Sequence, residues 1–157
     1  MSQKINVQDT HISEQLKVLH SSLISIASAM NRPQRDEALI REAGIPLDRA
    51  LFPLLVGIEK LGPIGVVELA DRTGRDYTTV SRQVAKLESL GLVLRQDGPT
   101  DRRVRIATVT SKGKAMTELV DAARERMGRA IFKSWDPQDM DDLIRLMRKF
   151  ADALDEG

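Results

Sequence analysis

The chain has 157 residues, which suits one domain or two small lobes with a common core. Its composition, 41% hydrophobic and 30% charged, is that of a folded protein, and its net charge of +1 shows no general basic character. Because the chain has no cysteine, disulfides and thiol chemistry are excluded. With only two histidines, His11 and His20, a histidine-rich metal centre is not expected, and neither is a cofactor.

No part of the sequence resembles a membrane or export segment. Residues 1–10 are polar and contain no signal-peptide core. No apolar run approaches the ~18–20 residues that a membrane span needs. We therefore expect a cytoplasmic protein without a membrane partner.

Charge is distributed unevenly along the chain. Residues 60–115 hold 11 basic and 6 acidic residues, whereas segments 1–59 and 116–157 are both net acidic. A basic middle segment suits contact with a polyanion, and acidic flanks suit contact with each other or with another chain. On charge alone, chance clustering on a solvated face remains an equal alternative.

The first predicted helix covers residues 11–31. Six apolar residues recur in it at spacings of three and four, which is the narrow seam of a coiled coil: Ile12, Leu16, Leu19, Leu23, Ile26 and Met30. Pro33 ends this helix. Residues 34–46 are charged and are predicted to form a connector with at most a short helical turn.

The second predicted helix covers residues 47–61 and ends at Gly62-Pro63. Pro53 should kink this helix unless it lies in the first turn, because proline lacks the amide hydrogen that a helix interior needs. A short third helix follows over residues 66–73. Val67 and either Ala70 or Leu69 should face inward from it, with Gly74 as its C-terminal cap.

The fourth predicted helix covers residues 77–90, and Asp76 or a neighbouring threonine can cap its start. Residues 92–95 and 104–110 are predicted to be two strands of a hairpin, with the turn at 96–103.

Two more helices complete the predicted order. Thr110 and Ser111 can cap a long helix, Asp136-Pro137 interrupts it, and a last helix runs to about Leu154. The predicted fold class is therefore mainly α with a small β-hairpin. Long terminal helices with narrow apolar seams are typical of a helical dimer interface, although the seams could also be buried within one chain.

The two helices over residues 66–90 form a helix-turn-helix, and the hairpin that follows makes it a winged one. Val80, Val84 and Leu87 share the face of the second helix that should meet the core. The opposite face is small, polar and basic, with Thr78, Ser81, Arg82, Ala85, Lys86 and Ser89.

That outer face suits the major groove of DNA, because hydroxyls and arginine can bond to phosphates and base edges. The residues near the helix start would lie closest to the bases: Tyr77, Thr78, Thr79, Ser81 and Arg82. Taken alone, an ordinary amphipathic surface helix is the more common explanation.

The charged hairpin favours the DNA-binding interpretation. We place six charged residues at its tip: Arg95, Asp97, Asp101, Arg102, Arg103 and Arg105. Arginine on a projecting ribbon can enter a minor groove or hold phosphates. Asp101 would repel phosphate, so it is interpreted as a partner that orients an arginine. A solvated, salt-bridged turn remains the alternative.

At this point the residues resemble a known family. The ordered set Leu69-Ala70, Thr79-Val80-Ser81-Arg82, Leu87-Glu88, Gly91-Leu92-Val93, Asp101-Arg102-Arg103 and Thr110-Ser111-Lys112-Gly113 is similar to the MarR (multiple antibiotic resistance regulator) family. The resemblance spans about residues 60–115, and the flanking helices fit in order and length. Pro53 departs from the common pattern of the family.

The resemblance implies a winged helix-turn-helix homodimer that binds a pseudo-palindromic operator in double-stranded DNA. Residues 47–115 would form the DNA-binding domain, and residues 1–46 and 116–157 the helical dimerisation region. The fourth helix would enter the major groove through the residues named above and Lys86. Arg103 would be the wing-tip arginine, Asp101 its partner and Arg102 an additional base.

The family resemblance also implies transcriptional repression that a small aromatic or anionic effector relieves by binding between the lobes. His20 is the single candidate for a ligand contact, although a histidine there is more often a hydrogen-bonded core or interface residue. The alternative function is a winged-helix module that binds an acidic protein partner. No nucleophile–base pair or cofactor loop supports an enzyme, and no catalytic residue is expected.

Overall fold

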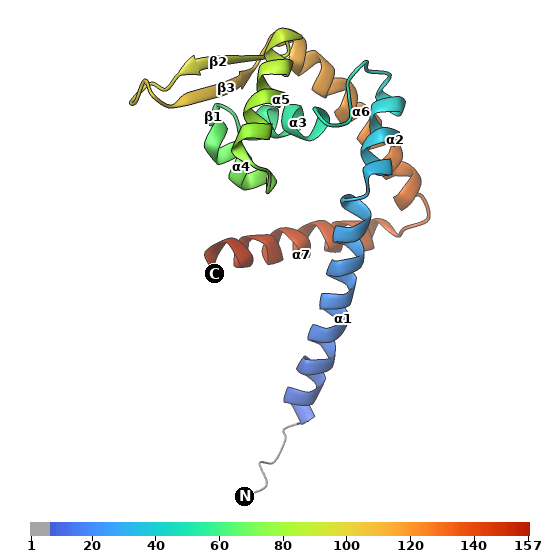
Figure 1. Ribbon diagram of the computed structural model, residues 1–157. Helices are drawn as coiled ribbons and strands as arrows, with labels where there is room; N and C mark the ends of the chain where they lie inside the picture. Colours follow the sequence, from blue (N-terminus) through green and yellow to red (C-terminus); the bar gives the residue numbers. More distant parts are fainter. Residues whose placement is uncertain (1–6) are drawn as a thin grey trace, which may run out of the picture.

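The computed structural model of the protein describes residues 7–157 (Figure 1), so residues 1–6 of the polar N-terminal segment lie outside the described part. The elements follow in the order α1 (Val7–Met30), α2 (Pro33–Ala43), α3 (Phe52–Leu61), β1 (Ile64–Gly65), α4 (Val66–Thr73), α5 (Tyr77–Ser89), β2 (Val93–Asp97), β3 (Arg105–Val109), α6 (Ser111–Phe132) and α7 (Pro137–Glu156). Within residues 7–157, no helix has the length and apolarity to cross a membrane. The predicted fold class, mainly α with a β-hairpin wing, is confirmed.

The three strands form one antiparallel sheet in the order β1-β3-β2. Ala107 of β3 pairs with Ile64 on one side and with Arg95 on the other. The hairpin of β2 and β3 projects from one end of the molecule, and α1 extends alone from the other (Figure 1). The sequence did not reveal β1, because two residues are too short to show an alternating pattern.

The core lies beneath α5. Val80, Val84 and Leu87 have no exposed surface, as predicted. They belong to one buried cluster that α3, α4 and α6 complete, with Leu54, Leu55, Ile58, Leu69, Val120 and Ala123 among its members. The apolar side of α5 is therefore fixed toward the core, and its polar side faces outward.

The prediction of a connector over residues 34–46 is wrong. Pro33–Ala43 is a regular helix with proline in its first turn. Gly44 ends it in the left-handed conformation at φ 66°, and Leu39 anchors it to the core. This is the usual arrangement of proline at a helix start and glycine after its end, so the sequence held the signal.

The second predicted helix is shorter than expected. It begins at Phe52 rather than at residue 47, and Pro53 lies in its first turn, where no kink arises. Leu47 and Leu51 are buried, although they precede the helix. Their burial explains why the apolar pattern seemed to start early.

Helix α4 has the predicted bounds but a different inward face. Val66, Leu69 and Ala70 are buried, whereas Val67 is 62% exposed, so its inward placement is wrong. Residues three and four positions after Val66 share its face, whereas Val67 is turned about 100° away from it. Gly74 caps the helix as predicted, in the left-handed conformation at φ 64°.

The terminal helices are the least covered elements. Neither α1, with 24 residues, nor α7, with 20 residues, contains a buried residue. Five of the six predicted seam residues of α1 are exposed: Ile12, Leu16, Leu19, Ile26 and Met30. This chain alone therefore does not cover the seam.

One corner joins α5, the wing and α6. Thr110 caps α6 as predicted, since its hydroxyl accepts the amide hydrogen of Gly113. Its own backbone N–H donates to the carbonyl of Leu92 at 3.0 Å. A Cβ atom on Gly113 would overlap that Leu92 oxygen. The corner can close only because residue 113 lacks a side chain.

We expect Gly113→Ala to destabilise the protein by about 1–3 kcal/mol, since the added methyl must displace backbone atoms. Gly128→Ala is the matched control on the same helix, because nothing lies within 4 Å of its added Cβ. That change should stabilise by about 0.5–1 kcal/mol. Urea unfolding of both variants measures the difference, and equal effects would contradict a tight corner at Gly113.

Candidate nucleic-acid interface

The start of α5 is held by a side-chain cap. The Asp76 carboxylate accepts the backbone N–H groups of Thr78, at 3.1 Å, and of Thr79, at 3.0 Å. The hydroxyl of Thr79 also donates to it. These hydrogen bonds, the one from the Thr79 hydroxyl first, lower the pKa of Asp76, so the cap is charged at neutral pH. The first turn of α5 is thereby fixed.

The structure places the predicted contact residues of α5 at different depths. Tyr77, Thr78, Arg82 and Lys86 are exposed, whereas Thr79 and Ser81 are partly buried. The Thr79 hydroxyl is engaged by the cap, so this residue both serves the helix start and lies at the outer face.

Four of these residues, together with Arg103 of the wing, line two separate hollows. Tyr77 and Arg103 line one groove of about 640 Å³, between the wing, β1 and α4. Thr79, Arg82 and Lys86 line an open hollow of about 390 Å³ beside residues 48–51. The helix start and the wing tip thus border one groove, while the two basic side chains of α5 lie by the loop before α3.

The wing tip has the predicted Asp101–Arg103 pair. The Asp101 carboxylate accepts the backbone N–H of Arg103 at 3.0 Å and its Nε at 3.2 Å. The Arg103 side chain is nevertheless 92% exposed. Asp101 therefore orients a guanidinium that projects into solvent, and Arg102 beside it is also exposed.

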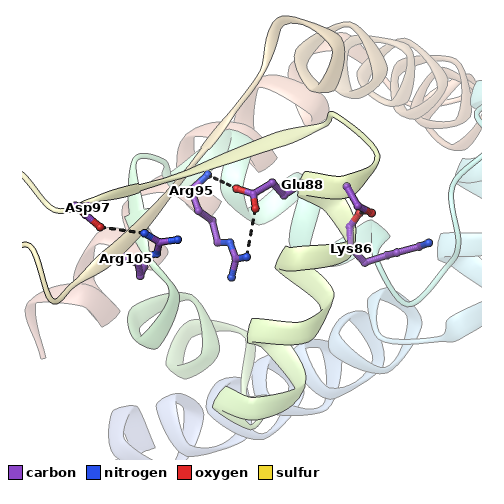
Figure 2. A network of polar contacts seen from close by, with 6 residues as sticks. Lys86, Glu88, Arg95, Asp97 and Arg105 are labelled. Atoms are coloured by element: carbon purple, nitrogen blue, oxygen red, sulfur yellow. Dashed lines mark hydrogen bonds and ion pairs between the residues drawn. The ribbon is translucent and has the colours of Figure 1, made fainter.

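Two further carboxylate–arginine pairs lie along the wing (Figure 2). Arg105 Nη1 donates to Asp97 at 3.0 Å across β2 and β3, and Arg95 Nη2 donates to Glu88 of α5 at 3.3 Å. The arginine side chains are 20% exposed at Arg95, 53% at Arg105 and 92% at Arg103. Placing Arg95 at the tip was wrong: it lies at the base of the wing, against α5.

Sequence reasoning missed a third arginine near α5. Arg75, in the turn before the helix, donates from Nη1 to Gln83 and to the carbonyl of Ala50, both at 3.2 Å. It therefore links α5 to the loop before α3. Its position directly after the helix-capping Gly74 was the available signal.

A small cavity of about 320 Å³ lies between α2 and this turn. Its lining includes Asp36, Arg49 and Arg75. Burial raises the pKa of Asp36, an effect that Arg124 and three other arginines oppose. His20, in contrast, is exposed on α1, and only α1 residues line the hollow beside it.

Known proteins share both the sequence pattern and the fold. The sequence model of the MarR family matches residues 47–104. An uncharacterised HTH-type transcriptional regulator of Bacillus subtilis, YxaD, is 33% identical over 108 residues, which are 69% of this chain and 76% of the relative.

Solved structures agree in fold. A MarR family protein from Bacillus stearothermophilus superposes with a TM-score of 0.74 at 22% identity, over 90% of this chain and 96% of that one. The transcriptional regulator BldR from Sulfolobus solfataricus gives 0.65 at 20% identity, over 97% and 99%.

MarR family proteins are transcription regulators and not enzymes. The similarity to the Bacillus subtilis relative is one of sequence and not of fold alone. This chain therefore belongs to the MarR family of DNA-binding transcriptional regulators.

Proposed function

We propose that the protein is a homodimeric, sequence-specific repressor that a small ligand releases from DNA. The observation that carries the DNA-contact part is the exposed basic face of α5 beside a wing whose tip arginine is oriented and solvent-exposed. In the proposal, α5 reads the major groove through Tyr77, Thr78, Thr79, Ser81, Arg82 and Lys86. Arg102 and Arg103 contact the flanking backbone and minor groove.

We expect Arg103→Ala to weaken binding to duplex DNA from the region upstream of the gene about tenfold, or roughly 1.4 kcal/mol. The plot of log affinity against log salt should also lose about one unit of slope per subunit, since a phosphate contact is removed. Fluorescence anisotropy with scrambled DNA as competitor measures both quantities.

Arg129→Ala is the matched control, because Arg129 is likewise an exposed arginine paired with a carboxylate, on α6 away from the wing. Its affinity should be unchanged. Selective binding by the wild type with no loss in Arg103→Ala would contradict a wing contact. No binding to any duplex would favour the alternative, a module that binds an acidic protein.

The dimer part of the proposal is supported by the terminal helices. Ile12, Leu16 and Leu19 on α1 and Ile144 and Met147 on α7 are exposed. Burying such a side chain contributes about 1.5–3 kcal/mol, so a second chain that covers both helices would gain much of its binding energy there. An apolar cavity of about 580 Å³, lined by residues of α1, α2, α6 and α7, adjoins this surface. We accordingly propose residues 1–46 and 116–157 as the dimerisation region and 47–115 as the DNA-binding domain.

We expect the wild type to have twice the 17.5 kDa mass of one chain, and Leu16→Asp to have the mass of one chain. Leu16 is 58% exposed in the single chain, so a carboxylate there disturbs only an interface between chains. Val67→Asp, at a similarly exposed valine of α4, is the control and should keep the doubled mass. Light scattering after gel filtration decides, and a wild type of single-chain mass would contradict the dimer.

For the ligand we propose a small aromatic carboxylate in the cavity beside Arg49 and Arg75. The lining holds two guanidiniums against the single carboxylate of Asp36, so its excess positive charge suits a carboxylate ligand. Arg75 also holds Gln83 of α5, so a ligand there would compete for the contact that positions the helix. A ligand contact at His20 stays a prediction, because no residue of the winged helix-turn-helix lines the hollow beside it.

With benzoate as the probe, we expect apparent DNA affinity to fall as benzoate is added to the wild type. Arg49→Ala should bind DNA normally and lose this response, because Arg49 contacts Glu37 and not α5. Repetition of the anisotropy titration with benzoate measures the effect. An unchanged response in Arg49→Ala would overturn the placement of the ligand.

A further inference from the structure

We propose that Glu88 is a positioning residue that sets the angle between α5 and the wing, so that both elements reach DNA together. The inference rests on the proposed DNA-binding function. It assigns Glu88 no contact with DNA, since its carboxylate would repel phosphate.

Glu88 connects the last turn of α5 to the first strand of the wing at two points (Figure 2). Its Oε2 accepts the backbone N–H of Arg95 at 2.9 Å, and its Oε1 accepts Nη2 of the same residue at 3.3 Å. Only residues 90–92 separate α5 from β2 along the chain. A carboxylate that bonds to both backbone and side chain fixes the short connection against rotation.

The pleat of the sheet directs the arginine toward α5. Side chains two residues apart on a strand share a face, and so do directly paired residues of neighbouring strands. Arg95 pairs with Ala107, and Asp97 pairs with Arg105, so all four side chains share one face. Ala107 is fully buried, so this is the core side of the sheet.

The pair is shielded from solvent at the base of the wing. Nε of Arg95 is buried and has no hydrogen-bond partner among the described residues, so Glu88 is the acceptor that holds this guanidinium. The N–H and then the guanidinium of Arg95 lower the pKa of Glu88, which keeps it charged at neutral pH. Without Glu88, a partly buried cation would lack its acceptor and would have to turn toward water, carrying β2 with it.

The proposal is tested by a double-mutant cycle on DNA affinity. If Glu88 places the wing, Arg103→Ala should weaken binding about tenfold in the wild type but less than about twofold in Glu88→Ala, because the wing is already misplaced. Glu88→Gln keeps an acceptor for the Arg95 N–H and should restore part of the Arg103 effect. Glu68→Ala removes an ion pair that lies within α4 alone, so the full Arg103 effect should persist there.

An equal Arg103 effect in the Glu88→Ala and wild-type backgrounds would overturn the proposal. A second measurement does not need DNA. Because the chain has no cysteine, spin labels at Lys86→Cys and Thr100→Cys report only the distance between α5 and the wing. Diluting labelled with unlabelled protein restricts the signal to one chain.

The label distances should be narrowly distributed with Glu88 present and broad in Glu88→Ala, while thermal unfolding shows that both proteins are folded. An unchanged width would overturn the role of Glu88 even if DNA binding is observed. Broadening of the label distances, together with no duplex binding by the unlabelled wild type, would uphold the positioning role and reject the proposed function instead.

Discussion

The burial of one face of α5 is the constraint on which the arrangement of the candidate interface depends. Val80, Val84 and Leu87 are completely buried in the core cluster, which also holds residues of α3, α4 and α6. The helix cannot turn about its axis without exposing them, at about 1.5–3 kcal/mol for each side chain. Arg82 and Lys86 consequently face outward whatever they bind. The polar residues of α5 are positioned by apolar residues that contact nothing outside the core.

The exposure of the arginine side chains increases from the base of the wing to its tip, and the three ion pairs differ in their roles accordingly. The pair at the base is mostly shielded and joins two elements, the middle pair joins two strands, and the pair at the tip leaves its guanidinium in water. Ion pairs in water contribute little to stability, whereas shielded ones hold geometry. The same residue types thus fix the wing at one end and present a cation at the other.

The sequence predicted most of the helices whose ends are marked by capping residues. It did not predict features that depend on contacts between separate elements. Gly74 and Asp76 delimit α4 and α5, so both helices and the winged fold could be predicted. Helix α2 was missed although Pro33 and Gly44 delimit it, because its charged residues resembled a loop. Arg95 was wrongly placed at the tip because the sequence alone shows neither the register of the two strands nor the contact between Arg95 and Glu88. The family pattern indicated the wing pair at Asp101 and Arg103, but the depth of each side chain required the structure.

Helix α6 is one continuous helix between the corner below the wing and the turn before α7. Its 22 residues, at 1.5 Å each, span about 33 Å from the corner below the wing to the turn before α7. In its last third, Arg126 bonds to Glu42 at the end of α2, so α6 is also tied to the first helical segment of the chain. In the dimer proposed above, the angle between the two copies of α6 would set the separation of the two wings. In the proposed dimer, a rotation of a few degrees at the interface would become a displacement of ångströms at the wing tips, so the spacing of the two DNA contacts would depend on residues that do not touch DNA.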